Sequence, residues 1–289
     1  MGIKNILVGL TGGDCDGSAL TAAYLVAKPF AADLDVLRVE PEPIQIIVRA
    51  ALEQFASKRG NTELIHALQH EEESRTLSAR AAFDEFVAEF QQGRDAPYGA
   101  GASWRQVIGD PVQTLIVEGR YSDLIVLGRG TRPDELPADA VANILVGCGR
   151  PLLLAPNAVL PSLGKTIAIA WKEAAEAARA VTAAMPLLQR SDRIVVLTAD
   201  ESGADPVANI RSAQHLAKSL ARHGFNPEAK RVTVERESPS RALVRSAVAE
   251  GADLLVMGAY SHGRTRELVF GGFTRELLKS CDLPLLLLH

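Results

Sequence analysis

The amino-acid sequence predicts an α/β protein built from two tandem parallel five-stranded sheets flanked by helices. Short apolar runs bounded by turn residues alternate with segments whose apolar residues recur at helical spacing. Runs that are apolar throughout are typical of parallel strands buried on both faces, and their alternation with helices favours right-handed crossovers. The whole pattern runs twice through the chain, which predicts two domains.

The first round of the pattern occupies residues 1–156. Its strands are expected at residues 4–9 and 34–40, within 103–111, at 123–128 and within 150–157. Its helices are expected near residues 20–27, 112–118 and 139–147. The spacing of apolar residues predicts that the long stretch over residues 44–92 is almost entirely helical.

The second round occupies residues 165–289, after a proline-containing linker at 156–164 that we take as the domain boundary. Its strands are expected at residues 165–171, 193–200, 229–237 and 254–258 and at the end of the chain. Its helices are expected at residues 173–188, 205–223 and 240–251 and from Gly271-Gly272 onward.

The two rounds match at particular positions, which indicates an internal repeat. Asp123 and Asp253 each lie five residues before a glycine, Gly128 or Gly258, at the far end of an apolar run. Cys148 and Cys281 each lie three residues before a proline that leads into a last apolar strand. Chance alone does not account for a Cys-x-x-Pro motif before both of these apolar strands. Both last strands are apolar, so leaving either as an exposed edge would invite aggregation.

The first round also carries an insertion, at about residues 41–95, which we expect to be a helical hairpin. One amphipathic stripe of the insertion consists of Ile44, Ile47, Val48, Ala51, Leu52 and Phe55. Long insertions serve either as extra packing at a dimer or domain face, or as a lid or partner surface, and both alternatives stay open. Its acidic run, Glu71–Glu73, is interpreted as a solvated helix face.

Composition narrows the class of protein. The net charge of −4, with no basic run longer than two residues, argues against nucleic-acid binding. No window reaches the ~20 apolar residues of a membrane span, and the N-terminus does not read as a secretion signal. Three scattered cysteines predict neither a disulfide framework nor a metal site, so the reducing cytosol is expected. No catalytic motif is present, and no metal ligands are predicted.

Glycines at a strand-to-helix junction suggest a phosphate site in the second half. Gly271-Gly272 opens the last helix, where backbone N–H groups can approach an anion at the positive helix end. The alternative is that these glycines serve only tight turns and close packing. At the matching place the first half has Ala138-Asp139, and its loop is three residues shorter. A carboxylate there would repel phosphate.

Taken together, these residues resemble a tandem universal stress protein. The resemblance covers nearly the whole chain and rests on residues 4–9, 109–128 and 252–288. It implies a flavodoxin-like or adenine nucleotide alpha hydrolase-like fold for each half. It also implies a stress-response role in the cytoplasm. Some family members bind ATP or another adenine nucleotide, so the resemblance implies such a ligand here.

Family members with nucleotide sites carry glycine, two residues, glycine, nine residues, then glycine followed by serine or threonine. In this sequence Gly258 and Gly271 match the first and third positions. Ser261 replaces the second glycine, Gly272 replaces the hydroxyl residue, and Thr274 lies two residues further on.

The resemblance places the adenosine at the end of the first strand of that half, near Ala170 and Trp171. That loop lacks the aspartate that many family members use there, whereas Asp14 or Asp16 would fit the part in the first half.

Three functions follow as alternatives. The favoured one is a stress-response regulatory protein that binds an adenine nucleotide in its C-terminal half. The second is a ligand-free scaffold for an unknown partner, acting through the insertion, and the third is a weak nucleotide hydrolase. The resemblance also implies that the last strands of the two halves pair inside the chain, as those of dimeric family domains do. That pairing would make a pseudo-dimer of one chain, and pairing with a second copy stays open.

Overall fold

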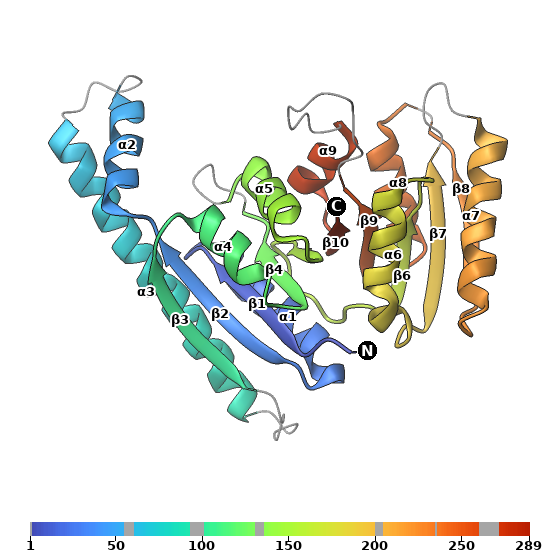
Figure 1. Ribbon diagram of the computed structural model, residues 1–289, viewed down its shortest axis with the longest axis horizontal. Coiled ribbons are helices and arrows are strands. Elements are labelled where there is room, and N and C mark those ends of the chain that lie inside the picture. The colour runs from blue at the N-terminus through green and yellow to red at the C-terminus, as the bar shows by residue number, and fades with distance from the viewer. Residues whose placement is uncertain are drawn as a thin grey trace.

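A computed structural model describes residues 2–54, 61–92, 101–130, 136–199, 205–234, 236–259 and 272–289. Within these residues the strands form one ten-stranded sheet in the order β3-β2-β1-β4-β5-β10-β9-β6-β7-β8 (Figure 1). The strands are β1 Asn5–Leu10, β2 Asp33–Glu40, β3 Ala102–Ile108, β4 Leu124–Gly128, β5 Leu152–Ala155, β6 Thr166–Ala170, β7 Arg193–Ala199, β8 Glu228–Val232, β9 Leu254–Gly258 and β10 Leu285–Leu288.

Helices cover both faces of this sheet. They are α1 Asp16–Ala27, η1 Lys28–Phe30, α2 Pro43–Gln54, α3 Asn61–Gln92, α4 Pro111–Gly119, α5 Ala138–Cys148, α6 Ala175–Leu188, α7 Pro206–Ala221, α8 Pro239–Ala249 and α9 Gly272–Ser280. Buried side chains of α1, α3, α6 and α7 share one core cluster, and those of α4, α5, α8 and α9 share another. Strand residues alternate between the two, as Ile6 and Val8 do with Leu7, because successive strand side chains point to opposite faces.

The predicted α/β class is confirmed, but the two five-stranded arrays are halves of a single sheet. All pairs within β1–β5 and within β6–β10 are parallel. Between the halves β5 and β10 pair antiparallel, with Leu153 opposite Leu286. Both leucines are buried, at 0% and 2% exposure. An unpaired edge of such strands would present open backbone groups and apolar side chains to other chains.

The repeated aspartates tie the middle strands of each half together. Oδ2 of Asp123, which precedes β4, accepts hydrogen bonds from the backbone N–H groups of Lys4 and Asn5 at the start of β1. Asp253, which precedes β9, accepts in the same way from Gly164, Lys165 and Thr166 at the start of β6. The repeat therefore reflects a shared role at the amino edge of the sheet, where each carboxylate accepts the N–H groups at the start of the neighbouring strand.

The repeated Cys-x-x-Pro also has a structural place. The carbonyl of Pro151 accepts the N–H of Ile125 at 3.0 Å, and the carbonyl of Pro284 accepts that of Leu255 at 2.9 Å. Cys148 and Cys281 are buried where the preceding helix ends. Each motif starts a last strand in register with its parallel neighbour.

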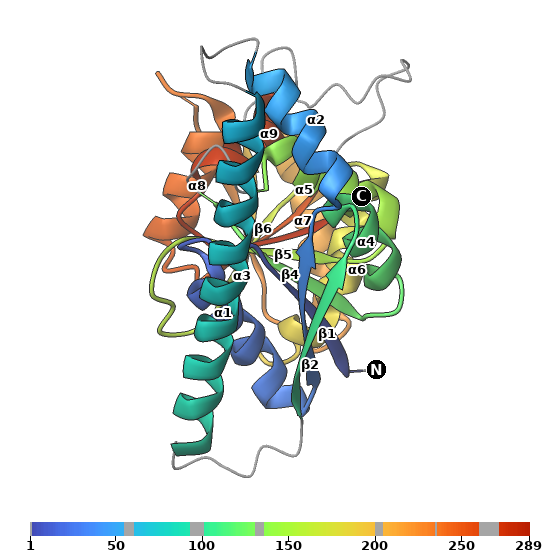
Figure 2. The same ribbon diagram turned by 90° about the vertical axis from the view of Figure 1, so that its left-hand side faces the viewer.

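The insertion forms α2 and α3, and α3 runs along the sheet beside β2 (Figure 2). Phe83 and Phe86 of α3 reach the main core, where Phe86 meets Tyr24 edge-on and Phe83 lies 5.5 Å from Trp104 between ring centroids. Between the two helices a small cluster is formed by Ile46, Ala50, Leu64 and Leu68. The long helix is thus part of the N-terminal core.

Each outermost strand of the sheet carries a basic side chain that is held in ion pairs. Arg105 of β3 pairs with Asp35 and Glu118 at 2.6 and 2.7 Å. At the opposite edge Lys230 of β8 pairs with Glu250 at 2.8 Å, and Arg193 reaches the same carboxylate. These hydrogen bonds, that of Lys230 first, lower the pKa of Glu250.

Among the helices of the described ranges, none combines the length and the apolar character needed to cross a membrane.

The pairing of β5 with β10 predicts a large stability loss on truncating Leu286. Leu286→Ala removes a buried side chain at the joint between the halves and should lower the free energy of unfolding by about 2–5 kcal/mol. Denaturant unfolding followed by tryptophan fluorescence measures it. Val159→Ala is the control, because Val159 is 92% exposed, and it should stay within about 0.5 kcal/mol. Equal losses in the two variants would contradict the packing.

Candidate functional site

Each half of the sheet has a switch point at its carboxyl edge, where ligands of open α/β sheets bind. In the N-terminal half this point lies between β1 and β4, and in the C-terminal half between β6 and β9. The helices that follow β1 and β6, α1 and α6, cover one face of the sheet. The helices that follow β4 and β9, α5 and α9, cover the other face. The two edges differ in what fills them.

In the C-terminal half the structure brings Ala170, Trp171 and Gly258 to one place. Ala170 ends β6 opposite Met257 of β9, and it is buried. The indole Nε1 of Trp171 donates to Ser212 Oγ of α7 at 3.0 Å, and the ring is packed against the core. The ring is therefore used for packing between β6 and α7.

Gly258 allows a close approach between the end of β9 and the first turn of α6. A Cβ built on Gly258 would lie 2.4 Å from the backbone nitrogen of Ala177. Ala174 precedes α6 without a side-chain capping bond. The first half repeats this contact, because a Cβ on Gly128 would lie 2.7 Å from Cys15, which precedes α1. Both glycines are required by helix packing at the switch point.

The other predicted residues lie at the start of α9. Gly272 is its first residue, and a Cβ there would meet nothing within 4 Å. Thr274 is buried in the first turn. Ser261 and Gly271 lie outside the described residues. Glu276 receives hydrogen bonds from Ser240 and Arg241, which tie α9 to α8.

In the first half the carboxylate of Asp16 accepts hydrogen bonds from the loop that precedes it. The buried carboxylate accepts the N–H of Thr11 at 3.0 Å, the N–H of Gly12 at 2.7 Å and the hydroxyl of Thr11 at 3.3 Å. Burial raises the pKa of Asp16, and these backbone hydrogen bonds oppose the rise. Asp16 therefore holds the turn after β1, and Asp14 is exposed beside it.

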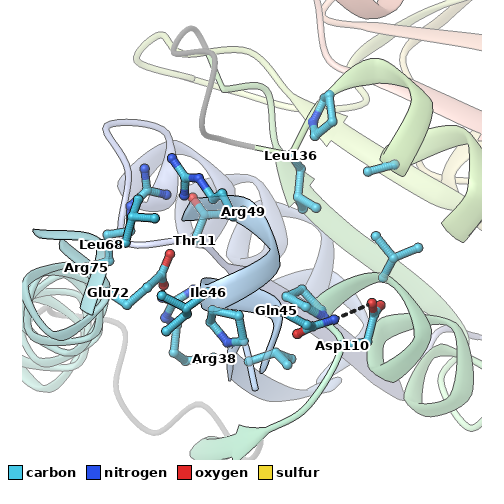
Figure 3. A pocket seen from close by; sticks show the side chains of 16 residues that line it. Thr11, Arg38, Gln45, Ile46, Arg49, Leu68, Glu72, Arg75, Asp110 and Leu136 are labelled. Atoms are coloured by element: carbon cyan, nitrogen blue, oxygen red, sulfur yellow. Dashed lines mark hydrogen bonds and ion pairs between the residues drawn. The ribbon is translucent and has the colours of Figure 1, made fainter. Parts of the chain in front are cut away.

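The structure has a cavity of about 360 Å³ at the carboxyl edge of the N-terminal half, which sequence reasoning did not find (Figure 3). It lies between the insertion and the ends of β1 and β2, with the starts of α4 and α5 on the other side. It is lined by Thr11, Arg38, Val39, Pro41, Gln45, Ile46, Arg49, Leu68, Glu72, Arg75, Asp110, Pro111, Val112, Leu136, Pro137 and Ala140.

Two sequence interpretations bear on this cavity. Glu72 was predicted to lie on a solvated face, which is wrong, because its carboxylate pairs with buried Arg38 at 2.7 Å and lines the cavity. The sequence feature that could have indicated this role is the position of Glu72 on α3, one turn before Arg75 and Thr76, on a helix that covers β2. Asp139, expected to repel an anion, is exposed, and the start of α5 lines the cavity with Leu136, Pro137 and Ala140.

Cys15, Cys148 and Cys281 are buried and form no disulfide bond, and burial was expected for Cys148 and Cys281. Burial raises the pKa of Cys148 and of Cys281, which disfavours the reactive thiolate. In the described part of the chain, no three or more His, Cys, Asp and Glu side chains are grouped to hold a metal ion.

The glycine contacts predict opposite responses at the two ends of the C-terminal site. Gly258→Ala should lower stability by about 1–3 kcal/mol, because the new methyl group meets backbone atoms of α6. Gly272→Ala should leave stability unchanged or raise it slightly, since the position is open and helical. Thermal unfolding of both variants beside the parent chain makes the comparison. A harmless Gly258→Ala would remove the packing explanation.

Comparison with known proteins finds a family match in the C-terminal half of the chain. The model of the Universal stress protein family matches residues 164–289. A universal stress protein of Synechocystis is 33% identical over 93 residues, which cover 32% of this chain and 30% of that relative's length.

Solved structures extend the likeness in fold to the whole chain. A universal stress protein from Archaeoglobus fulgidus superposes with a TM-score of 0.69 at 14% identity, over 98% of this chain and 95% of that one. A putative universal stress protein from Pseudomonas aeruginosa gives 0.60 at 17% identity, over 99% and 93%. Residues 164–289 therefore match the model of the Universal stress protein family, and the chain as a whole is similar in fold to solved universal stress proteins.

Proposed function

We propose that the protein is a stress-response regulatory protein that binds ATP or another adenine nucleotide at the carboxyl edge of its C-terminal half. The observation that carries the proposal is the open start of α9, where a Cβ built on Gly272 would meet nothing within 4 Å. Backbone N–H groups at a helix start favour anions, and ligands of such sheets bind at this switch point.

Further features of the same edge support the proposal. Gly272 opens α9 with free space where a side chain would stand, so a phosphate can approach its backbone N–H. The family match covers this half of the chain. The role we assign to this edge is binding. We place the protein in the cytosol, a location that its three buried cysteines, which form no disulfide, support.

A nucleotide at this edge should stabilise the protein against heat. ATP at a hundred times its Kd should add about 2.7 kcal/mol to the free energy of unfolding. Gly272→Asp places a carboxylate at the start of α9, where the space is open, and should abolish the ATP-dependent rise in Tm by repelling phosphate. Differential scanning calorimetry with and without ATP measures this effect.

Gly272→Asn is the matched control, because it has the same shape without the charge and should keep most of the ATP effect. If millimolar ATP does not shift the Tm of the parent chain, the nucleotide proposal is wrong. If the Asp and Asn variants respond alike, the phosphate does not lie at the start of α9.

A second candidate function, a scaffold acting through the insertion, is favoured by the outer face of α2. Ile44, Ile47, Val48 and Leu52 recur there at helical spacing and are 57%, 43%, 52% and 68% exposed. Phe55, at the end of the predicted stripe, lies outside the described residues. Contiguous exposed apolar residues of this kind mark interaction surfaces.

Deletion of residues 44–92 would not test this function cleanly, because Phe83 and Phe86 of α3 belong to the main core. A substitution on the exposed face of α2 tests the function without removing core residues. Val48→Lys should abolish co-purification of a partner protein with the tagged chain while leaving Tm unchanged. Val248→Lys on α8 is the control, since Val248 is 54% exposed against 52% for Val48. Partner recovery that is equal in both variants would remove α2 as the contact surface.

A further inference from the structure

The cavity in the N-terminal half has walls that are held firmly in place. Gly12, after β1, has a φ of +77°, and a Cβ there would lie 2.2 Å from the backbone oxygen of Arg75. The backbone of α3 therefore rests directly on the loop that follows β1. Thr76 adds a hydrogen bond to Glu40 at 2.8 Å, at the end of β2. The insertion thus forms a fixed wall of the cavity.

The charges around the cavity favour an anion of low charge. Three arginines and two carboxylates line it, a net charge of +1. Glu72 pairs with Arg38 at 2.7 Å. Asp110 accepts hydrogen bonds from the side chain of Gln45 at 2.7 Å and from the N–H of Gln113 at 2.8 Å, where it caps α4.

The other two arginines come from different helices of the insertion and meet on one side of the cavity (Figure 3). Arg75 of α3 lies 2.9 Å from Glu71, and Arg49 of α2 lies 3.9 Å from the same carboxylate. Glu71 itself does not line the cavity. Two guanidinium groups therefore border a space that already contains the carboxylates of Asp110 and Glu72. A triphosphate would meet both of these, whereas a single anionic group can lie beside the arginines.

Apart from Thr11 and Gln45, the rest of the lining is apolar. It consists mainly of Val39, Ile46, Leu68, Val112, Leu136 and Ala140. A volume of about 360 Å³ with apolar walls and a few placed polar groups is typical of sites for small organic ligands. The arrangement fits a molecule with an apolar body and one charged end.

We propose that this cavity binds a small amphipathic organic anion, with its apolar body between α2, α3 and the start of α5 and its anionic group at Arg49 and Arg75. The site is separate from the proposed nucleotide site, which lies in the other half of the sheet. Its specificity comes from the insertion, because α2 and α3 supply both arginines.

The experiment uses 8-anilinonaphthalene-1-sulfonate, a fluorescent dye with an apolar body and one sulfonate, on the full-length chain. We expect saturable binding with one site per chain. Arg49→Gln and Arg75→Gln should each weaken binding at least tenfold, because each removes a charged donor without changing the apolar walls. Isothermal titration and fluorescence titration give the affinity and stoichiometry. Displacement of the dye by octanoate or by octyl phosphate identifies the preferred anionic group, and displacement by neither would contradict the proposal.

Two controls separate the site from general apolar binding. Arg245→Gln on α8, at an exposed arginine outside the cavity, should leave dye affinity unchanged. The uncharged dye N-phenyl-1-naphthylamine should bind the parent chain more weakly and should not respond to Arg49→Gln. Arg49 is 38% exposed, so its replacement should leave Tm near that of the parent. Equal dye affinity in the Arg49, Arg75 and Arg245 variants, or dye binding without saturation, would overturn the proposal.

Discussion

The antiparallel pairing of β5 with β10 is the constraint on which the rest of the structure depends. Each half has a parallel array whose fifth strand is almost wholly apolar, and neither array could leave that strand uncovered. Pairing makes one sheet of the two arrays, with Leu152, Leu153 and Leu154 opposite leucines of β10. Both core clusters draw on side chains of both halves, so the halves share two continuous hydrophobic layers.

Much of the fold could be predicted from the sequence because its repeated residues satisfy local backbone requirements. Asp123 and Asp253 bind N–H groups at the start of a first strand, and Gly128 and Gly258 admit a helix turn that a side chain would block. These needs recur in each half, so the residues recur at equal spacing. They identified the fold well, but as packing residues they carried little information about a ligand.

The cavity could not be predicted in the same way. Its arginines come from β2, α2 and α3, and no fixed spacing in the sequence links them. Their convergence depends on how α3 lies over the turn at Gly12, which is a tertiary contact. The prediction for the C-terminal half is more mixed. Ala170 and Gly258 lie together at the sheet edge, whereas the ring of Trp171 is taken up by its hydrogen bond to Ser212. Ser261 and Gly271 lie outside the described residues, so the candidate loop stays a prediction.

The ion pairs on the two edge strands have a consequence for how copies of the chain associate at high concentration. Two separate arrays would expose four strand edges, whereas the joined sheet exposes two, β3 and β8. At those two edges Arg105 and Lys230 are held in ion-pair networks, and a further strand docking there would have to desolvate them. Strand addition by another copy of the chain is therefore disfavoured at both edges by this desolvation cost.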